Sequence, residues 1–151
     1  MIFDTHIHLD RFPPEFDAAA EIAAARKAGI GHFLIPGVDR PGWHSVSEVA
    51  GRVDGALAAF GLHPLASAEW NAGCREELID RLQQKQAVAV GEIGLDRLID
   101  VPLPEQELAF REQLQIATEL SLPVLIHCRK MVGRLLEILR EEQVGQVGGI
   151  M

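Results

Sequence analysis

Cysteine is scarce in this sequence, and the two that occur, Cys74 and Cys128, lie far apart. Neither belongs to the closely spaced pattern of a disulfide framework or a zinc knuckle, which suits a reducing compartment. No segment contains the roughly 20 apolar residues that a membrane-spanning helix needs, and the N-terminus lacks the basic-then-apolar pattern of a secretory signal. We therefore expect a cytoplasmic protein that does not contact the membrane.

Basic residues are also few in this sequence. The 14 Lys and Arg residues face 22 Asp and Glu, so the formal net charge is −8. This balance argues against charge-driven, non-specific binding of nucleic acid, although a nuclease whose bound metal ions supply positive charge locally is not excluded. With 151 residues and 48% hydrophobic content, the chain suits one cored domain rather than two, and we expect residues 1–151 to form a single domain.

Apolar, strand-like runs alternate with amphipathic helical stretches along the chain. Because each strand then buries both of its faces, the pattern predicts a parallel sheet covered by helices. We expect strands at 2–8, 32–36, 55–61, 87–90, 123–127 and 146–151, and helices at 16–27, 41–53, 75–84, 104–120 and around 135–139.

Metal-competent side chains fall at the ends of four of these strands: His6 and His8, His63, Glu92, and His127. A TIM barrel places its active site at the C-terminal ends of successive strands, so this pattern favours a barrel. A dinucleotide-binding sheet would instead need a glycine-rich turn after the first strand, and the sequence has none there.

The His-x-His pair and Glu92 carry the chemical argument. Side chains alternate along a strand, so His6 and His8 share one face and form a metal-binding pair, unless they are solvent-facing residues of an edge strand. Glu92 interrupts an apolar run, and burial of an unpaired carboxylate is costly, which favours a functional role. His127 alone is equally typical of a hydrogen-bonded core histidine. Trp43 and Trp70 are better explained by packing against the barrel wall than by base stacking.

Four motifs together resemble the TatD family of metal-dependent deoxyribonucleases. They span residues 3–10 (FDTHIHLD), 61–64 (GLHP), 90–96 (VGEIGLD) and 122–129 (LPVLIHCR), in the right order and spacing. That family belongs to the amidohydrolase-like superfamily and has a TIM barrel with a two-metal site. The resemblance implies an α/β fold, a TIM (β/α)8 barrel of which this chain supplies about five βα units and the start of strand six.

The resemblance also implies a set of metal ligands. His6 and His8 match ligands of a first metal ion, Glu92 matches the carboxylate that bridges both ions, and His127 matches a ligand of the second. The cofactors would be two divalent metal ions, Mg²⁺, Mn²⁺ or Zn²⁺. Such a pair suits phosphodiester hydrolysis, because it can activate a water and neutralise the phosphate together.

Three further residues are expected on the substrate side. His63 would face a phosphate, Asp96 would orient a ligand or water unless it caps a loop, and Arg129 would contact phosphate unless it pairs with a surface acid. The histidine that the family carries after strand six and the strand-eight aspartate that serves as its general base have no counterpart here. No residue of this chain therefore inherits the catalytic base.

Three functions remain open at this stage. The first is a TatD-type deoxyribonuclease acting on DNA, and the second is an amidohydrolase or lactonase acting on a small carbonyl substrate. The third is an inactive metal-binding or assembly fragment, because the sequence provides fewer strands than the eight of a barrel. We expect truncation, and self-association through the open sheet edges that an incomplete barrel would expose.

Overall fold

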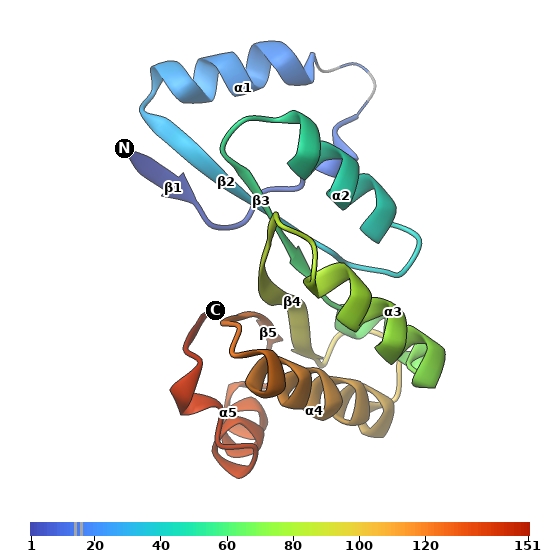
Figure 1. Cartoon of the computed structure of the whole chain (residues 1–151). Helices are drawn as coiled ribbons and strands as arrows, with labels where there is room; N and C mark the ends of the chain where they lie inside the picture. Colours follow the sequence, from blue (N-terminus) through green and yellow to red (C-terminus); the bar gives the residue numbers. More distant parts are fainter. Residues whose placement is uncertain (14, 16) are drawn as a thin grey trace.

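The fold is a curled, six-stranded parallel sheet flanked by helices (Figure 1). The computed structural model describes residues 1–13, 15 and 17–151. The strands are β1 (Ile2–Asp4), β2 (Ile30–Pro36), β3 (Ala56–Phe60), β4 (Ala87–Asp96), β5 (Val124–Arg129) and β6 (Gly149–Ile150). The α-helices are α1 (Ala18–Lys27), α2 (Trp43–Arg52), α3 (Ala72–Leu82), α4 (Leu103–Leu120) and α5 (Val132–Glu141), and the 3₁₀ helices are η1 (Leu9–Arg11), η2 (Pro64–Glu69) and η3 (Val144–Gln146).

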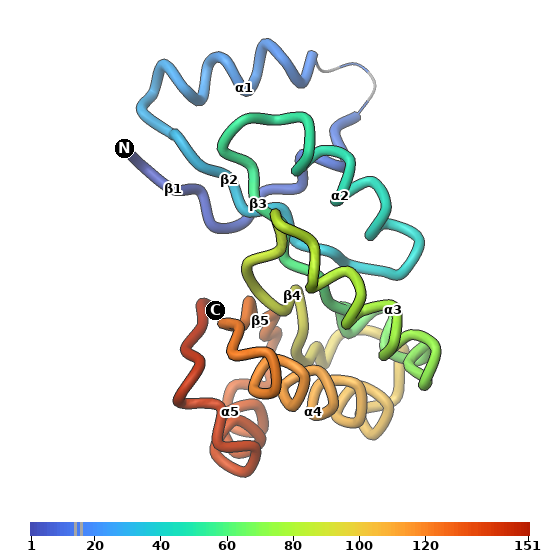
Figure 2. Tube along the Cα trace, viewed as in Figure 1, coloured from blue at the N-terminus to red at the C-terminus, as the bar shows by residue number. Residues whose placement is uncertain are grey.

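Each strand pairs in parallel with the next strand of the chain, in the order β1-β2-β3-β4-β5-β6. The colour gradient of Figure 2 follows this order through the sheet. A doubly wound sheet would reverse its strand order part-way, whereas a TIM barrel does not. The expected α/β barrel fold, with five βα units and the start of a sixth strand, is therefore confirmed as a half-barrel.

The main core lies between the sheet and its helices. It joins strand residues such as Phe60 and Ile93 to helix residues such as Trp43, Leu78 and Leu114. The other face of the sheet carries a small separate cluster, formed by Leu34, Ala59, Ala89 and Leu125. Both faces of the central strands are thus apolar, which is why the sequence shows continuous apolar runs rather than strict alternation.

Most predicted elements are present with shifted ends. The helix expected from residue 16 begins at Ala18, where Asp17 Oδ1 accepts hydrogen bonds from the backbone N–H groups of Ala19 (3.0 Å) and Ala20 (3.2 Å). Phe16 itself lies outside the described residues. The sixth strand is shorter than expected: residue 146 belongs to η3, and β6 covers only Gly149–Ile150.

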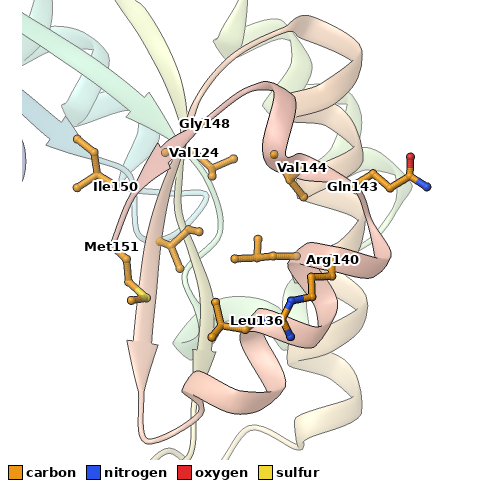
Figure 3. Close-up of a pocket in the computed structure, with 12 residues that line it drawn as sticks. Val124, Leu136, Arg140, Gln143, Val144, Gly148, Ile150 and Met151 are labelled. Atoms are coloured by element: carbon orange, nitrogen blue, oxygen red, sulfur yellow. The ribbon is translucent and has the colours of Figure 1, made fainter.

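An apolar pocket of about 590 Å³ lies beside β5, α5 and β6 (Figure 3). Val124, Leu136, Arg140 and Ile150 are among its lining residues. None of the residues proposed for metal or substrate lines this pocket. In the part of the chain that the structure describes, no helix is long and apolar enough to cross a bilayer.

Candidate metal centre

The His-x-His pair follows β1 rather than lying within it. The strand ends at Asp4, and Asp4 Oδ1 accepts a hydrogen bond from the backbone N–H of His6 at 3.1 Å. This local turn replaces strand pairing at His6, so the prediction that both histidines stand on one strand face was wrong. The two imidazoles still converge, with ring centroids 5.3 Å apart.

Glu92 lies inside β4, at an irregular point of the sheet. Two residues of this strand, Gly91 and Glu92, face one residue of β5, Leu125, between the flanking paired positions. Such a bulge re-aims a side chain. A Cβ at Gly91 would come within 2.6 Å of the Leu125 carbonyl oxygen, so glycine permits this close approach. The backbone N–H of Glu92 donates to the Gly37 carbonyl at 2.9 Å.

His127 joins β5 to the two carboxylates of β4. Its Nδ1 lies 3.1 Å from Glu92 Oε1, and its Nε2 lies 3.1 Å from Asp96 Oδ2. The other oxygen of Asp96, Oδ1, accepts the backbone N–H of Leu98 at 2.8 Å. Asp96 therefore caps the turn after β4 and also contacts His127, a candidate ligand.

His63 approaches the same group from the loop after β3. Its ring centroid lies 4.2 Å from that of His127, and its Nδ1 accepts the backbone N–H of Leu65 at 3.1 Å. Because Nδ1 is used as an acceptor, a neutral His63 carries its proton on Nε2. The residue is 6% exposed.

The side chains form two metal-competent groups that share one carboxylate. One group is His6, His8 and Glu92, and the other is His63, Glu92 and His127; in each, one donor atom per residue lies within 4.8 Å of the others. Imidazole nitrogen with carboxylate oxygen is a donor set that suits Zn²⁺ and Mn²⁺, and carboxylates also suit Mg²⁺.

Two unpaired polar atoms lie beside the first group. In the described part of the chain, His8 Nδ1 and Asp10 Oδ1 are buried without a hydrogen-bond partner, 3.7 Å apart. Buried polar atoms are nearly always satisfied, and an ion or water commonly explains an exception. The residues present therefore fit a divalent cation. Asp10 is not among the residues expected at the site, although it lies two residues after His8 and ends the motif of residues 3–10.

Glu92 and His127 stabilise each other's charged forms, whereas His63 is held neutral. Burial by itself would raise the pKa of Glu92, but the hydrogen bond with His127 and the neighbouring histidines bring it below its ordinary value. The same hydrogen bond raises the pKa of His127. His63 behaves in the opposite way, because burial and then repulsion from His127 lower its pKa to about 4.

The remaining candidates lie at the margin. Arg129 is exposed at the end of β5, opposite Asp96 in the strand register. Burial by itself would raise the Asp96 pKa, but the Leu98 N–H, the hydrogen bond with His127 and the charges of His127 and Arg129 bring it below its ordinary value. His32 and His44 are exposed and belong to neither metal-competent group. Both cysteines are free.

Trp43 packs behind this site rather than facing it. The side chain is fully buried, and its indole N–H donates to the Gly61 carbonyl at 2.9 Å. A Cβ at Gly37, whose carbonyl holds Glu92, would lie 2.8 Å from Trp43 Cδ1. The expectation that this tryptophan packs against the barrel wall is confirmed.

Comparison with known proteins shows the family to which this arrangement of histidines and carboxylates belongs. The family model described as TatD related DNase matches residues 3–151. The chain belongs to the TatD family. Its TatD relatives include the 3'-5' ssDNA/RNA exonuclease TatD of Klebsiella pneumoniae, 33% identical over 92% of this chain and 53% of that protein. The uncharacterised metal-dependent hydrolase YabD of Bacillus subtilis is 33% identical over 100% of this chain and 60% of that protein.

Solved TatD structures support the fold. The TatD homologue YjjV of Escherichia coli superposes with a TM-score of 0.81 at 32% identity, over 94% of this chain and 56% of that one. A TatD family hydrolase of Entamoeba histolytica gives a TM-score of 0.84 at 21% identity, which concerns the fold alone. This TatD chain thus spans a little over half the length of the relatives it matches. Membership establishes a relationship to metal-dependent hydrolases and nucleases.

Proposed function

We propose that this protein takes part in phosphodiester hydrolysis of DNA, as a TatD-type deoxyribonuclease that uses two divalent metal ions. The observation that carries the proposal is Glu92, whose carboxylate is common to both metal-competent groups. One side chain with two acceptor oxygens can serve two cations at once, which is the requirement of a two-ion site.

The proposed ligands are His6 and His8 for one ion, His127 for the other, and Glu92 for both. Two such ions would supply positive charge for the phosphate and lower the pKa of a nearby water. The carboxylates of Glu92 and Asp96 hold the His127 ring in place. On the other side, His6 Nε2 lies 3.3 Å from Glu92 Oε2.

The substrate side is proposed to consist of His63, Asp96 and Arg129. A neutral His63 presents an Nε2–H donor, which can hydrogen-bond a phosphate oxygen without repelling the metal ions. Arg129 adds an exposed cation beside the site, suited to the next phosphate of a strand. No residue of this chain is proposed as the general base.

Four related expectations remain part of the proposal. DNA is the proposed partner, and the cytoplasm is the proposed location. Residues 1–151 are proposed to act as a single domain that unfolds in one cooperative transition. We also propose self-association, because exposed apolar side chains occur at both outer strands, with Ile2 57% and Ile150 46% exposed.

Metal binding by the 151-residue chain tests the ligand set directly. Titration calorimetry with Mn²⁺ or Zn²⁺ on the wild type, His6→Ala and Glu92→Ala is compared with His44→Ala, an exposed histidine on α2. We expect stoichiometric binding that is lost at Glu92, weakened at His6 and unchanged at His44. Equal binding by all four proteins would refute the assignment.

Activity tests separate the three functions. Release of nucleotides from a labelled single-stranded DNA, dependent on Mg²⁺ or Mn²⁺ and abolished by Glu92→Ala, is the expected result. Hydrolysis of a lactone or amide with no action on DNA would instead favour the amidohydrolase alternative. Metal binding without either activity would identify the chain as a metal-binding or assembly fragment.

A further inference from the structure

Two glutamines on α4 are buried as deeply as the apolar core. Gln106 is 2% exposed and Gln113 is 0% exposed. They are seven residues apart, close to two helical turns, so they lie on the same face of the helix. Burial of an amide is costly unless its polar atoms are hydrogen-bonded. The hydrogen-bond partners of each glutamine therefore indicate its structural role.

Gln113 pairs with the backbone directly before His63. Its Oε1 accepts the N–H of Leu62 at 2.6 Å, and its Nε2 donates to the carbonyl of the same residue at 3.2 Å. Both backbone groups of Leu62 are therefore satisfied by one side chain, in the way that a neighbouring strand would satisfy them. Gln113 therefore fixes the backbone that follows β3, which ends at Phe60.

Gln106 makes the same arrangement at the end of β4. Its Oε1 accepts the N–H of Asp96 at 2.9 Å, and its Nε2 donates to the Asp96 carbonyl at 3.1 Å. The same Nε2 also donates to the Val101 carbonyl at 2.8 Å, which ties down the loop that leads into α4. One helix face thus holds the backbone at Asp96 and at the residue directly before His63.

Asp96 and His63, the residue that follows the held Leu62, converge on one histidine. Asp96 Oδ2 lies 3.1 Å from His127 Nε2, and the His63 ring packs edge-on against the His127 ring. We propose that Gln106 and Gln113 are positioning residues of the metal centre, which set His63 and Asp96 around His127. This inference rests on the proposed function, since it concerns the same site.

Substitution of residues that orient metal ligands typically weakens metal affinity by about 10–100-fold. We expect a loss of this size for Gln106→Met and Gln113→Met, which keep the length of the side chain and remove the amide. In Gln113→Glu one oxygen can still accept the Leu62 N–H, so its affinity should lie between those of Gln113→Met and the wild type.

Two controls on the same helix separate positioning from general stability. Gln115 is an exposed glutamine whose Nε2 donates to Glu142 at 3.1 Å, and Gln115→Met should leave metal binding unchanged. Leu114 is fully buried, and Leu114→Ala should lower the melting temperature while Co²⁺ affinity stays at the wild-type value.

The measurement is Co²⁺ binding by the folded chain, followed by visible absorption, which reports both affinity and ligand geometry. Weaker binding and an altered spectrum in the two buried-glutamine variants, with both controls at wild-type values, would support the proposal. Wild-type affinity and spectrum in those variants, or the same loss in Leu114→Ala, would overturn it.

A second readout distinguishes failure of this inference from failure of the proposed function. If the wild type binds no Co²⁺, the metal-centre function fails, and positioning is judged on the metal-free protein. There, the ring ¹⁵N resonances of His63 and His127 should shift in Gln113→Met and Gln106→Met and stay in place in Gln115→Met. Unchanged resonances would overturn the inference.

Discussion

Replacement of Trp43 by phenylalanine removes one buried hydrogen bond and part of one buried ring. In the wild type the indole N–H satisfies the carbonyl of Gly61, which is itself buried, and the side chain is fully enclosed. Phenylalanine has no donor to replace it. The variant therefore leaves a buried acceptor without a partner, two residues before His63.

The expected cost follows from these two losses. An unsatisfied buried acceptor costs about 1–3 kcal/mol. The smaller ring leaves a cavity that adds about 1 kcal/mol. The sum of about 2–4 kcal/mol is a large part of the roughly 5–15 kcal/mol that stabilises a typical domain. At about 2–4 °C per kcal/mol, the melting temperature should fall by roughly 4–16 °C.

Urea denaturation followed by far-ultraviolet circular dichroism measures this loss, and Trp70→Phe is the matched control. Trp70 is half-buried and donates to the Glu112 side chain at 2.9 Å, where water can replace the bond. We expect the control to lose about 0.5–1 kcal/mol. If Trp43→Phe were no less stable than Trp70→Phe, the buried hydrogen bond from Trp43 to Gly61 would not contribute more to stability than the half-buried bond of Trp70.

Four further results are expected. Gly94→Ala should unfold the chain or abolish metal binding, because a Cβ at φ +150° would overlap the His127 carbonyl oxygen of β5. In the metal-free protein, NMR titration should show His63 neutral at pH 6 and His127 largely protonated. The lowered pKa means that the unfolded state takes up the His63 proton first, so His63 reduces stability as pH falls from about 6.5 to about 4. The raised pKa of His127 has the opposite sign: its contribution is present in acid and is lost as pH rises through the folded value. Mn²⁺ at about 100 times its Kd should add about 2.7 kcal/mol to the free energy of unfolding, and a chelator should remove this gain. Sedimentation should show concentration-dependent association that Phe3→Lys and Ile150→Lys reduce, since these side chains are 44% and 46% exposed.

Each of these results has a clear contrary outcome. A Gly94→Ala protein with wild-type stability and metal affinity would show that β5 can move away from the added Cβ without loss of stability. Titration of both histidines near their ordinary pKa would refute the electrostatic account. A melting temperature that is indifferent to Mn²⁺ and chelator would contradict the metal centre, and a monomer at every concentration would contradict self-association.

The alternation of strands and helices was readable from the sequence, because it depends on local periodicity. Each apolar run has turn residues or an amphipathic stretch after it, and the six runs became six strands in chain order. The boundaries shifted where a side chain competed with the backbone pattern. Asp4 ended the first strand early by accepting the His6 N–H, and a 3₁₀ helix at 144–146 occupies the start of the expected last strand.

The chemistry at the strand ends was readable for a different reason. In a parallel sheet all carboxyl ends lie at one edge, so polar residues after successive strands must gather there. This rule predicts that His6, His8, His63, Glu92 and His127 gather at one edge of the sheet. It could not show that His63 joins the second metal-competent group, because that depends on how far the loop after β3 folds inward.

The buried glutamines were not found from sequence, since Gln106 and Gln113 look like ordinary polar positions of an amphipathic helix. Their burial follows from where α4 packs on the ends of β3 and β4, which is a long-range contact. By itself the sequence determined the strand order and the residue types at the site, through periodicity and the rule of parallel strands. Only the tertiary structure decided which side chains meet, because contacts between residues far apart in the chain depend on packing that no local pattern records.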